Sequence, residues 1–233
     1  MGAYFVTGTD TDAGKTMVAS GLLALARQRD MSTLGLKPVA SGCDKTPAGL
    51  RNIDALTLGE QSRPQVPYET INPYAYEPAI APHLAARRAG RVPTLNHLVA
   101  ATAEPLAWQR DLTLIEGAGG WRVPLNQHED LAGLAVRLRL PVILVIGLKL
   151  GCLNHARLSA EAICADGLRL AGWAGNLIDP DFAVDEHDYQ ANLATLGQTL
   201  QAPCLGLIPR LDAGSPGQRA TAAAQHLSLP SAD

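Results

Sequence analysis

The chain is poor in cysteine, in long apolar runs and in net charge, and each shortage excludes a class of protein. Its four cysteines lie far apart without a CxxC pair, so neither a disulfide framework nor a zinc knuckle is indicated, and reduced thiols are expected. The longest apolar run, residues 140–148, is too short to span a membrane, and no signal-peptide pattern precedes Tyr4. The formal charge of -3 offers no basic surface for nucleic acid or for a membrane. We expect a soluble, cytoplasmic protein.

What the sequence does contain is an alternation of short apolar runs with longer helical patterns. Hydrophobic residues make up 47% of the 233 residues, enough for one α/β domain over residues 1–233. Several runs are apolar throughout, which is typical of strands covered on both faces in a parallel sheet. The predicted strands are residues 4–8, 33–39, 112–116, 141–147, 170–178 and 204–208, and the predicted helices are residues 14–29, 94–109 (kinked or broken at Pro105), 130–138, 154–165 and 189–200. This order predicts a doubly wound, mostly parallel sheet with helices on both faces.

Two regions depart from this alternation. Residues 41–93 are rich in proline, tyrosine and asparagine and lack a clear periodicity. A stretch of this length predicts an irregular excursion beside a functional site or a subunit contact. The last residues, 213–233, are rich in alanine, serine and glycine and form either a loose tail or a final helix.

Residues 8–16, GTDTDAGKT, lie between a predicted strand and a predicted helix, as a phosphate-binding P-loop does. Backbone N–H groups in such a loop surround phosphates, and the helix N-terminus adds a favourable dipole. Lys15 would neutralise the β- and γ-phosphates of ATP, and the Thr16 hydroxyl would coordinate magnesium. Five residues separate Gly8 from Gly14, one more than in the common pattern. The segment predicts a P-loop NTPase-type fold that binds ATP with Mg²⁺.

A magnesium site needs carboxylates as well, because Mg²⁺ takes oxygen ligands and keeps several waters. Glu116 ends an apolar run at the C-terminal edge of a predicted strand, where open α/β sheets bind ligands. The glycine-rich residues 117–120 that follow allow another backbone to approach closely. Asp54 is either a helix N-cap or a second magnesium ligand, and its spacing does not choose between the two.

A second lysine, Lys37, lies in the apolar segment 35–39. Burying an unpaired ammonium group is costly, so a lysine in a buried strand needs a counter-charge, which nearby phosphates would supply. Ser41 would reach the same space. The alternative is a solvent-exposed lysine on an edge strand.

Together these segments resemble the dethiobiotin synthetases, ATP-dependent enzymes of biotin biosynthesis, over most of the chain. The resemblance rests on the segments YFVTGTDT, GKT, KPVASG, LRNID, NPY, PH, EGAGGW and LKLGCLNH, which begin at residues 4, 14, 37, 50, 72, 82, 116 and 148. The longer glycine spacing is also that of the family. The resemblance implies that 7,8-diaminononanoate, CO₂ or bicarbonate, and ATP give dethiobiotin, ADP and phosphate. A carbamate would form on one amine, ATP would phosphorylate it, and the second amine would close the ring.

The resemblance also implies roles for individual residues. Lys37, Lys15 and Thr11 match catalytic positions, and Ser41 and Thr11 match positions near the carbamate and the diamine. Thr16, Asp54 and Glu116 match the magnesium ligands. The positions that match nucleotide contacts are Asp12, Ala13, Gly14, Lys15, Thr16, Met17, Asp54, Glu116, Gly117, Ala118, Gly119, Asn176, Pro209, Arg210 and Leu211.

A last set of positions concerns a second subunit. Gly151, Cys152 and Asn154 begin a predicted helix, and its N-terminal N–H groups suit the carboxylate of the diamine. In the family this segment comes from the neighbouring subunit, so the resemblance implies a homodimer with sites at the interface. Asn154 has a second interpretation as a simple helix N-cap, and both roles are compatible.

Two other classes of ATP-binding protein share parts of this pattern. A partitioning ATPase would carry a second lysine inside the P-loop, where this chain has Asp10, and a basic surface for DNA or a membrane. An ATP-dependent amidotransferase would carry a fused glutaminase with a nucleophilic cysteine, for which no residues remain. Both are less consistent with the sequence than the ligase.

Overall fold

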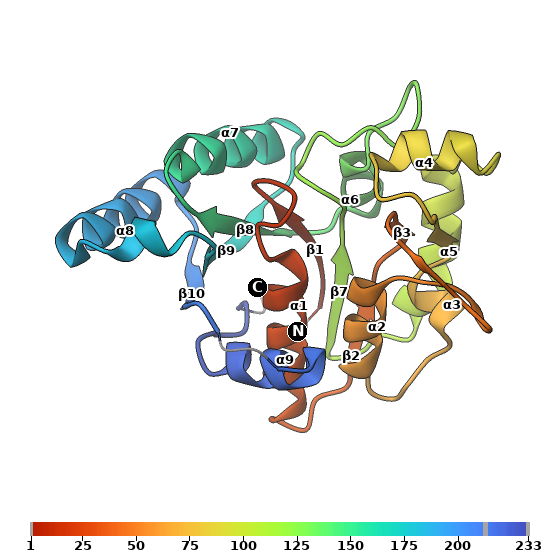
Figure 1. Cartoon of the computed structure of the whole chain (residues 1–233), viewed down its shortest axis with the longest axis horizontal. Coiled ribbons are helices and arrows are strands. Elements are labelled where there is room, and N and C mark those ends of the chain that lie inside the picture. The colour runs from red at the N-terminus through yellow and green to blue at the C-terminus, as the bar shows by residue number, and fades with distance from the viewer. Residues whose placement is uncertain (1, 212–213, 232–233) are drawn as a thin grey trace.

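The computed structural model describes residues 2–211 and 214–231, and its centre is a six-stranded sheet (Figure 1). The strands follow the order β10-β9-β8-β1-β7-β2, and every neighbouring pair is parallel. Their bounds are β1 Ala3–Gly8, β2 Thr33–Leu36, β7 Leu112–Glu116, β8 Val142–Leu148, β9 Leu170–Leu177 and β10 Cys204–Ile208. The six predicted strands are therefore confirmed, with shifts at their ends.

Helices cover both faces of this sheet, as the sequence predicts. One face packs on α1 Lys15–Arg27, α2 Ile53–Glu60 and α9 Pro216–Ala224, and the other on α5 Leu95–Ala107, α6 Ala132–Leu138, α7 Cys152–Ala165 and α8 Glu186–Leu200. Alternate residues of β1 point to opposite sides: Phe5 packs into the cluster that includes α5 to α8, and Tyr4 and Val6 into the cluster with α1. The doubly wound α/β class is confirmed.

The predicted strand 33–39 is wrong at its C-terminal end. β2 stops at Leu36, and the Lys37 N–H donates to the carbonyl of Ile71 at 2.9 Å instead of to the central sheet. Pro38 then has no N–H to donate, so the ladder with β7 cannot continue. The short strand β3, Val39–Ala40, pairs instead with β6, Tyr74–Ala75, in a sheet of its own. Lys37 consequently lies just beyond the edge of the central sheet.

Residues 41–93 contain more regular structure than expected. An antiparallel hairpin joins β4, Asp44–Thr46, to β5, Gly49–Arg51. It is followed by α2, α3 Tyr68–Ile71, β6 and α4 Pro82–Arg88. Apart from α2 with eight residues, these elements span two to seven residues, too few for a helical or strand periodicity to be read.

The remaining differences are at helix ends. Pro105 does not break α5, because it lies in the last turn and removes a single backbone hydrogen bond there. A short 3-10 helix, Pro180–Ala183, precedes α8. Of the two interpretations for residues 213–233, the final helix is present as α9; residues 213, 232 and 233 lie outside the described part. Over the described residues, no helix has the length and apolar character needed to cross a membrane.

Candidate active site

The P-loop lies at the C-terminal edge of the sheet, between the central strand β1 and α1. Gly14 is the N-cap of α1 with a φ of 96°, a left-handed conformation that glycine adopts without strain. The Thr9 N–H donates to the Val145 carbonyl of β8 at 2.9 Å, and the Gly147 N–H donates to Thr9 Oγ1 at 3.3 Å. These two hydrogen bonds anchor the loop to β8.

A cleft of about 870 Å³ opens beside this loop. It is walled by the P-loop, by the segment after β2, by the start of α2, by residues 79–82 and by the glycine-rich segment after β7. The predicted site residues that line it are Thr11, Asp12, Gly14, Lys15, Thr16, Met17, Lys37, Ser41, Asp54, Glu116, Ala118 and Gly119. The fold thus gathers residues from five separate segments at one edge of the sheet.

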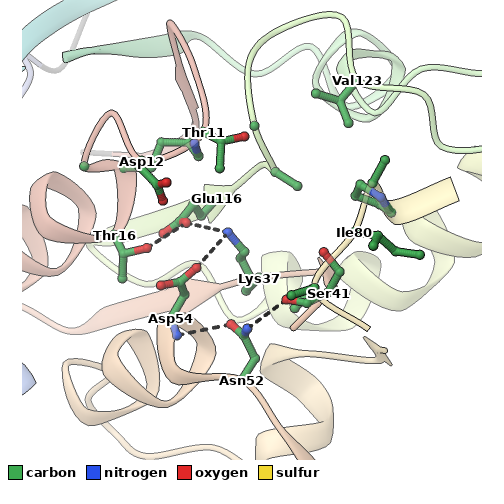
Figure 2. Close-up of a pocket in the computed structure, with 18 of the residues that line it drawn as sticks. Thr11, Asp12, Thr16, Lys37, Ser41, Asn52, Asp54, Ile80, Glu116 and Val123 are labelled. Carbon is green, nitrogen blue, oxygen red and sulfur yellow. Dashed lines mark hydrogen bonds and ion pairs between the residues drawn. The ribbon is translucent and has the colours of Figure 1, made fainter. Parts of the chain in front are cut away.

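Side chains from the P-loop and from the segment after β2 both contact the Glu116 carboxylate (Figure 2). Its Oε1 accepts a hydrogen bond from Thr16 Oγ1 at 2.9 Å and another from Lys37 Nζ at 2.6 Å. The residue is only 1% exposed, and its Oε2 is buried with no hydrogen-bond partner among the described residues. An unsatisfied buried carboxylate oxygen is costly, so this atom is suited to a ligand in the cleft.

Lys37 is buried, so the exposed edge-strand alternative is wrong. Besides Glu116, its Nζ donates to the Gly117 carbonyl at 2.9 Å and lies 3.4 Å from Asp54 Oδ2. Burial by itself would lower the pKa of Lys37, but the carboxylates of Glu116 and Asp54 raise that pKa above its ordinary value. The ammonium group therefore stays charged within the cleft.

Lys15 is also buried, and its Nζ donates to the Asp10 carbonyl at 3.0 Å. Burial, and after it the positive charge of Lys37, lowers the pKa of Lys15. Two buried ammonium groups thus face the same cleft. A polyphosphate bound there would supply the negative charge that Lys15 lacks.

Asp54 is not the helix N-cap, so that alternative is wrong. The N-cap of α2 is Asn52, whose Oδ1 accepts hydrogen bonds from the N–H groups of Asp54 and Ala55 at 3.1 and 3.2 Å. Asp54 is thereby free to direct its carboxylate towards Lys37 (Figure 2). The Nδ2 of Asn52 also donates to the Ser41 carbonyl at 3.4 Å, so one side chain holds two walls of the cleft together.

The oxygen atoms of Thr16, Asp54 and Glu116 fit a magnesium ion. Mg²⁺ is usually bound by one or two carboxylates together with phosphate oxygens and water, and the free Oε2 of Glu116 offers one such ligand. In the described part of the chain, no group of three or more His, Cys, Asp or Glu residues forms a complete metal cage. This set therefore suits a metal that arrives with a nucleotide.

The predicted nucleotide residues beyond the cleft lie around the P-loop. Asn176 Nδ2 donates to the carbonyl of Ala13 at 3.2 Å, and Asn176 leaves no room for a Cβ atom at Gly14. In the ladder between β9 and β10, Asn176 pairs with Ile208. Residues 209–211 (Pro209, Arg210 and Leu211) therefore leave the sheet next to Asn176 and do not line the cleft. Gly117 does not line the cleft. A Cβ atom at this position would lie 3.0 Å from the Phe5 ring, so the ring occupies the space beside the glycine.

Gly151, Cys152 and Asn154 are not brought into the cleft of their own chain. Gly151 is the N-cap of α7, so the N-cap interpretation of Asn154 is wrong. Cys152 is buried, whereas Asn154 is exposed, and the preceding Leu150 is 89% exposed. An ion pair of 3.4 Å between Lys149 and Asp10 connects this segment to the P-loop.

The chain is similar in sequence to a described protein family and to several named proteins. Residues 2–217 match the family described as AAA domain. The chain is 74% identical to the ATP-dependent dethiobiotin synthetase BioD of Chromohalobacter salexigens, over 99% of both chains. It is 56% identical to the proteins of the same name from Cellvibrio japonicus (97% of this chain, 96% of the relative) and Pseudomonas aeruginosa strain UCBPP-PA14 (98% and 97%). The chain belongs to the dethiobiotin synthetase family. It is an ATP-dependent ligase of biotin biosynthesis.

Solved structures that resemble this dethiobiotin synthetase family member share its fold. The MinC:MinD cell division protein complex of Aquifex aeolicus matches with a TM-score of 0.61 and 16% identity, covering 97% of this chain and 95% of that one. A ParA family ATPase from Chlorobium tepidum matches with a TM-score of 0.55 and 11% identity, covering 97% and 99%. At these identities the likeness shows the P-loop NTPase fold alone.

Two residues of this dethiobiotin synthetase family member that organise the cleft were missed in the sequence. Asn52 is the N-cap of α2. Asparagine is a preferred N-cap residue, and an acidic residue in the first turn, here Asp54, is typical of a helix start, so the sequence pattern predicts this role. Asn72 is buried, and its Nδ2 donates to the Lys37 carbonyl at 2.6 Å. No local sequence pattern predicts that contact, because 35 residues separate the two partners.

Proposed function

We propose that the protein converts 7,8-diaminononanoate, CO₂ and ATP into dethiobiotin, ADP and phosphate. Relatives that are named ATP-dependent dethiobiotin synthetase and are up to 74% identical over nearly the full chain support this reaction. The observation that carries it within the site is the buried pair of Lys37 and Glu116, to which the half-buried Thr16 is hydrogen-bonded at the edge of the cleft. It places a cation and a free carboxylate oxygen beside the P-loop, where a phosphoryl group would be transferred.

The chemistry needs mainly positioning and charge stabilisation. A carbamate formed on one amine attacks the γ-phosphorus of ATP, the bond to the β-phosphate oxygen breaks, and ADP leaves. The second amine then attacks the carbon of the resulting carbamic-phosphoric anhydride, phosphate departs, and the ureido ring closes. Lys15 and Lys37 stabilise the charge on the transferred group. Thr11 and Ser41, which line the same cleft, orient the carbamate and the diamine.

Magnesium is part of this proposal. Thr16, Asp54 and Glu116 would hold the ion, since all three offer oxygen atoms at the cleft. Bound together with ATP, the ion would neutralise phosphate charge. The buried Lys37 keeps the two carboxylates in place before any ligand arrives.

The remaining contacts are assigned to the nucleotide and to a second subunit. Asn176 and residues 209–211 would border the adenine, because they lie together at the end of β9 and β10 beside the P-loop. Gly151, Cys152 and Asn154 would bind the substrate carboxylate in the cleft of a partner copy, since they do not reach their own. All four cysteines are free, which suits the cytoplasm.

The test is a product assay with the purified protein. With diaminononanoate, bicarbonate and Mg-ATP, we expect dethiobiotin and ADP to appear in equal amounts. Omitting the diamine should abolish dethiobiotin and reduce ATP cleavage to background. ATP cleavage that does not depend on the diamine would overturn the assignment.

A further inference from the structure

A second cavity, of about 660 Å³, lies beside the reaction cleft. Its walls are α4, the start of α5 and the loop that precedes α6, which lie close together in Figure 1. The two hollows share two of these walls, α4 and the loop that precedes α6: Pro82 and Pro124 line the cleft, whereas His83 and Asn126 line the second cavity. Nothing in the proposed reaction uses this second cavity.

The single carboxylate of the cavity already has partners for both oxygens. Glu129 Oε2 accepts hydrogen bonds from the Leu95 N–H at 3.0 Å and from Asn126 Nδ2 at 2.8 Å. Its Oε1 accepts from Arg137 Nη2 at 3.3 Å. The ion pair with Arg137 and the two hydrogen bonds offset part of this negative charge and so reduce its repulsion of an anion in the cavity.

The basic side chains of the cavity are Arg87, His83 and His128, and among the described residues none of them donates a side-chain hydrogen bond. Arg87 and His128 are exposed, and within residues 2–211 and 214–231 neither side chain forms an ion pair within 4 Å, although the His128 ring lies near enough to Glu129 to lower the pKa of that carboxyl. His83 Nδ1 is buried and also lacks a hydrogen-bond partner. A buried polar atom without a partner is uncommon in proteins and indicates a missing ligand or water. The cavity thus offers an exposed guanidinium and an exposed imidazole that exchange only water for a ligand, and beside them the His83 ring, whose buried Nδ1 has no acceptor among the described residues.

We propose that this cavity is a second binding site for a small molecule that carries a carboxylate or phosphate group. The planar guanidinium of Arg87 matches the paired oxygens of either group, and the imidazoles of His83 and His128 add hydrogen bonds. The cavity is large enough for a small metabolite rather than an inorganic ion alone. Since it borders both residues 79–82 and residues 122–124 of the cleft, an occupant would contact the segments that shape the reaction site. The proposal does not depend on which reaction the cleft performs.

The test is a titration followed by NMR at the histidine rings, at constant pH and with Mg-ADP saturating the P-loop. Inorganic phosphate and succinate are added in separate experiments, so that the two kinds of anion are distinguished. We expect the ring signals of His83 and His128 to shift and saturate with at least one of them. Arg87→Gln should raise the Kd about tenfold or more, as expected for the loss of a charge-assisted hydrogen bond.

The matched control is Arg88→Gln, because Arg88 is equally exposed on α4 but does not line the cavity. It should leave the Kd unchanged. Thermal unfolding of both variants checks that each remains folded. The proposal is overturned if neither anion gives saturable shifts, which would mean that water alone fills the cavity. It is equally overturned if the two arginine variants weaken binding to the same extent.

Discussion

Lys37 Nζ lies 2.6 Å from Glu116 Oε1, although 79 residues separate them in the chain. The contact follows from the register of the sheet, in which Leu36 of β2 pairs with Ile115 of β7. Lys37, which follows the end of β2, and Glu116, the last residue of β7, therefore lie at the same edge of the sheet and meet there. A buried pair of this kind depends on both partners, because each compensates the charge of the other.

Replacing Lys37 should lower both the stability of the fold and the turnover rate, for two different reasons that can be distinguished. Lys37→Met leaves Glu116 as an uncompensated buried charge, and we expect a loss of about 3–5 kcal/mol in the free energy of unfolding. Turnover should fall about 100- to 1000-fold, because a donor to the transferred group is missing. The double variant Lys37→Met, Glu116→Gln should regain much of the stability but none of the turnover. Urea denaturation and steady-state kinetics measure the two effects, and normal turnover in either variant would contradict the role of Lys37.

Glu116→Gln tests the magnesium site with little change in shape. The amide retains one oxygen but loses the negative charge, so the Mg²⁺ concentration for half-maximal activity should rise at least about tenfold. A magnesium titration of the steady-state rate measures this. Glu104→Gln, on the exposed side of α5, is the control and should keep the wild-type value. Identical magnesium dependence in both variants would remove Glu116 from the ion's ligands.

The glycine-rich segment after β7 is held at its far end by Asp166. This carboxylate accepts hydrogen bonds from Trp121 Nε1 and from Arg122 Nη2, both at 2.8 Å, and Trp121 packs edge-on against Phe5. Asp166→Ala leaves the indole N–H without an acceptor and should cost about 1–3 kcal/mol in unfolding free energy.

Asp166→Asn is the comparison for that variant, since its amide oxygen still accepts from Trp121. It should lose clearly less stability than the alanine variant in urea denaturation. Equal losses would mean that the charge of Asp166, rather than the acceptor for Trp121, supports the segment.

Two glycines offer a paired test of the packing. Gly206 of β10 has a φ of 144°, and a Cβ atom there would lie 1.9 Å from the His226 carbonyl oxygen. Gly206→Ala should therefore lower the free energy of unfolding by at least about 2 kcal/mol. Gly197 lies inside α8 with open space around it, so Gly197→Ala should raise stability by about 0.5–1 kcal/mol. Changes of the same sign in urea denaturation would contradict this account of both sites.

Much of the fold could be predicted because its long elements carry strong periodic patterns. Strands buried on both faces have uninterrupted apolar sequences. The P-loop is recognised by its glycines, lysine and threonine between a predicted strand and a predicted helix. Residues 41–93 could not be predicted in this way, since strands of two or three residues and helices of four to eight leave too short a pattern. The apolar run 33–39 predicts too long a strand, because Pro38 cannot donate a ladder hydrogen bond and β2 ends at Leu36.

For the site, the sequence alone determined which groups are available: two lysines, two carboxylates, a threonine at the P-loop, and their order along the chain. Only the tertiary structure decided how they are combined. The register of β2 against β7 joins Lys37 to Glu116, Asn52 rather than Asp54 caps α2, and Asn72 holds the Lys37 carbonyl. Local patterns report how a segment folds, but distances between segments far apart in the chain depend on strand register and side-chain packing, which arise only when the whole core assembles.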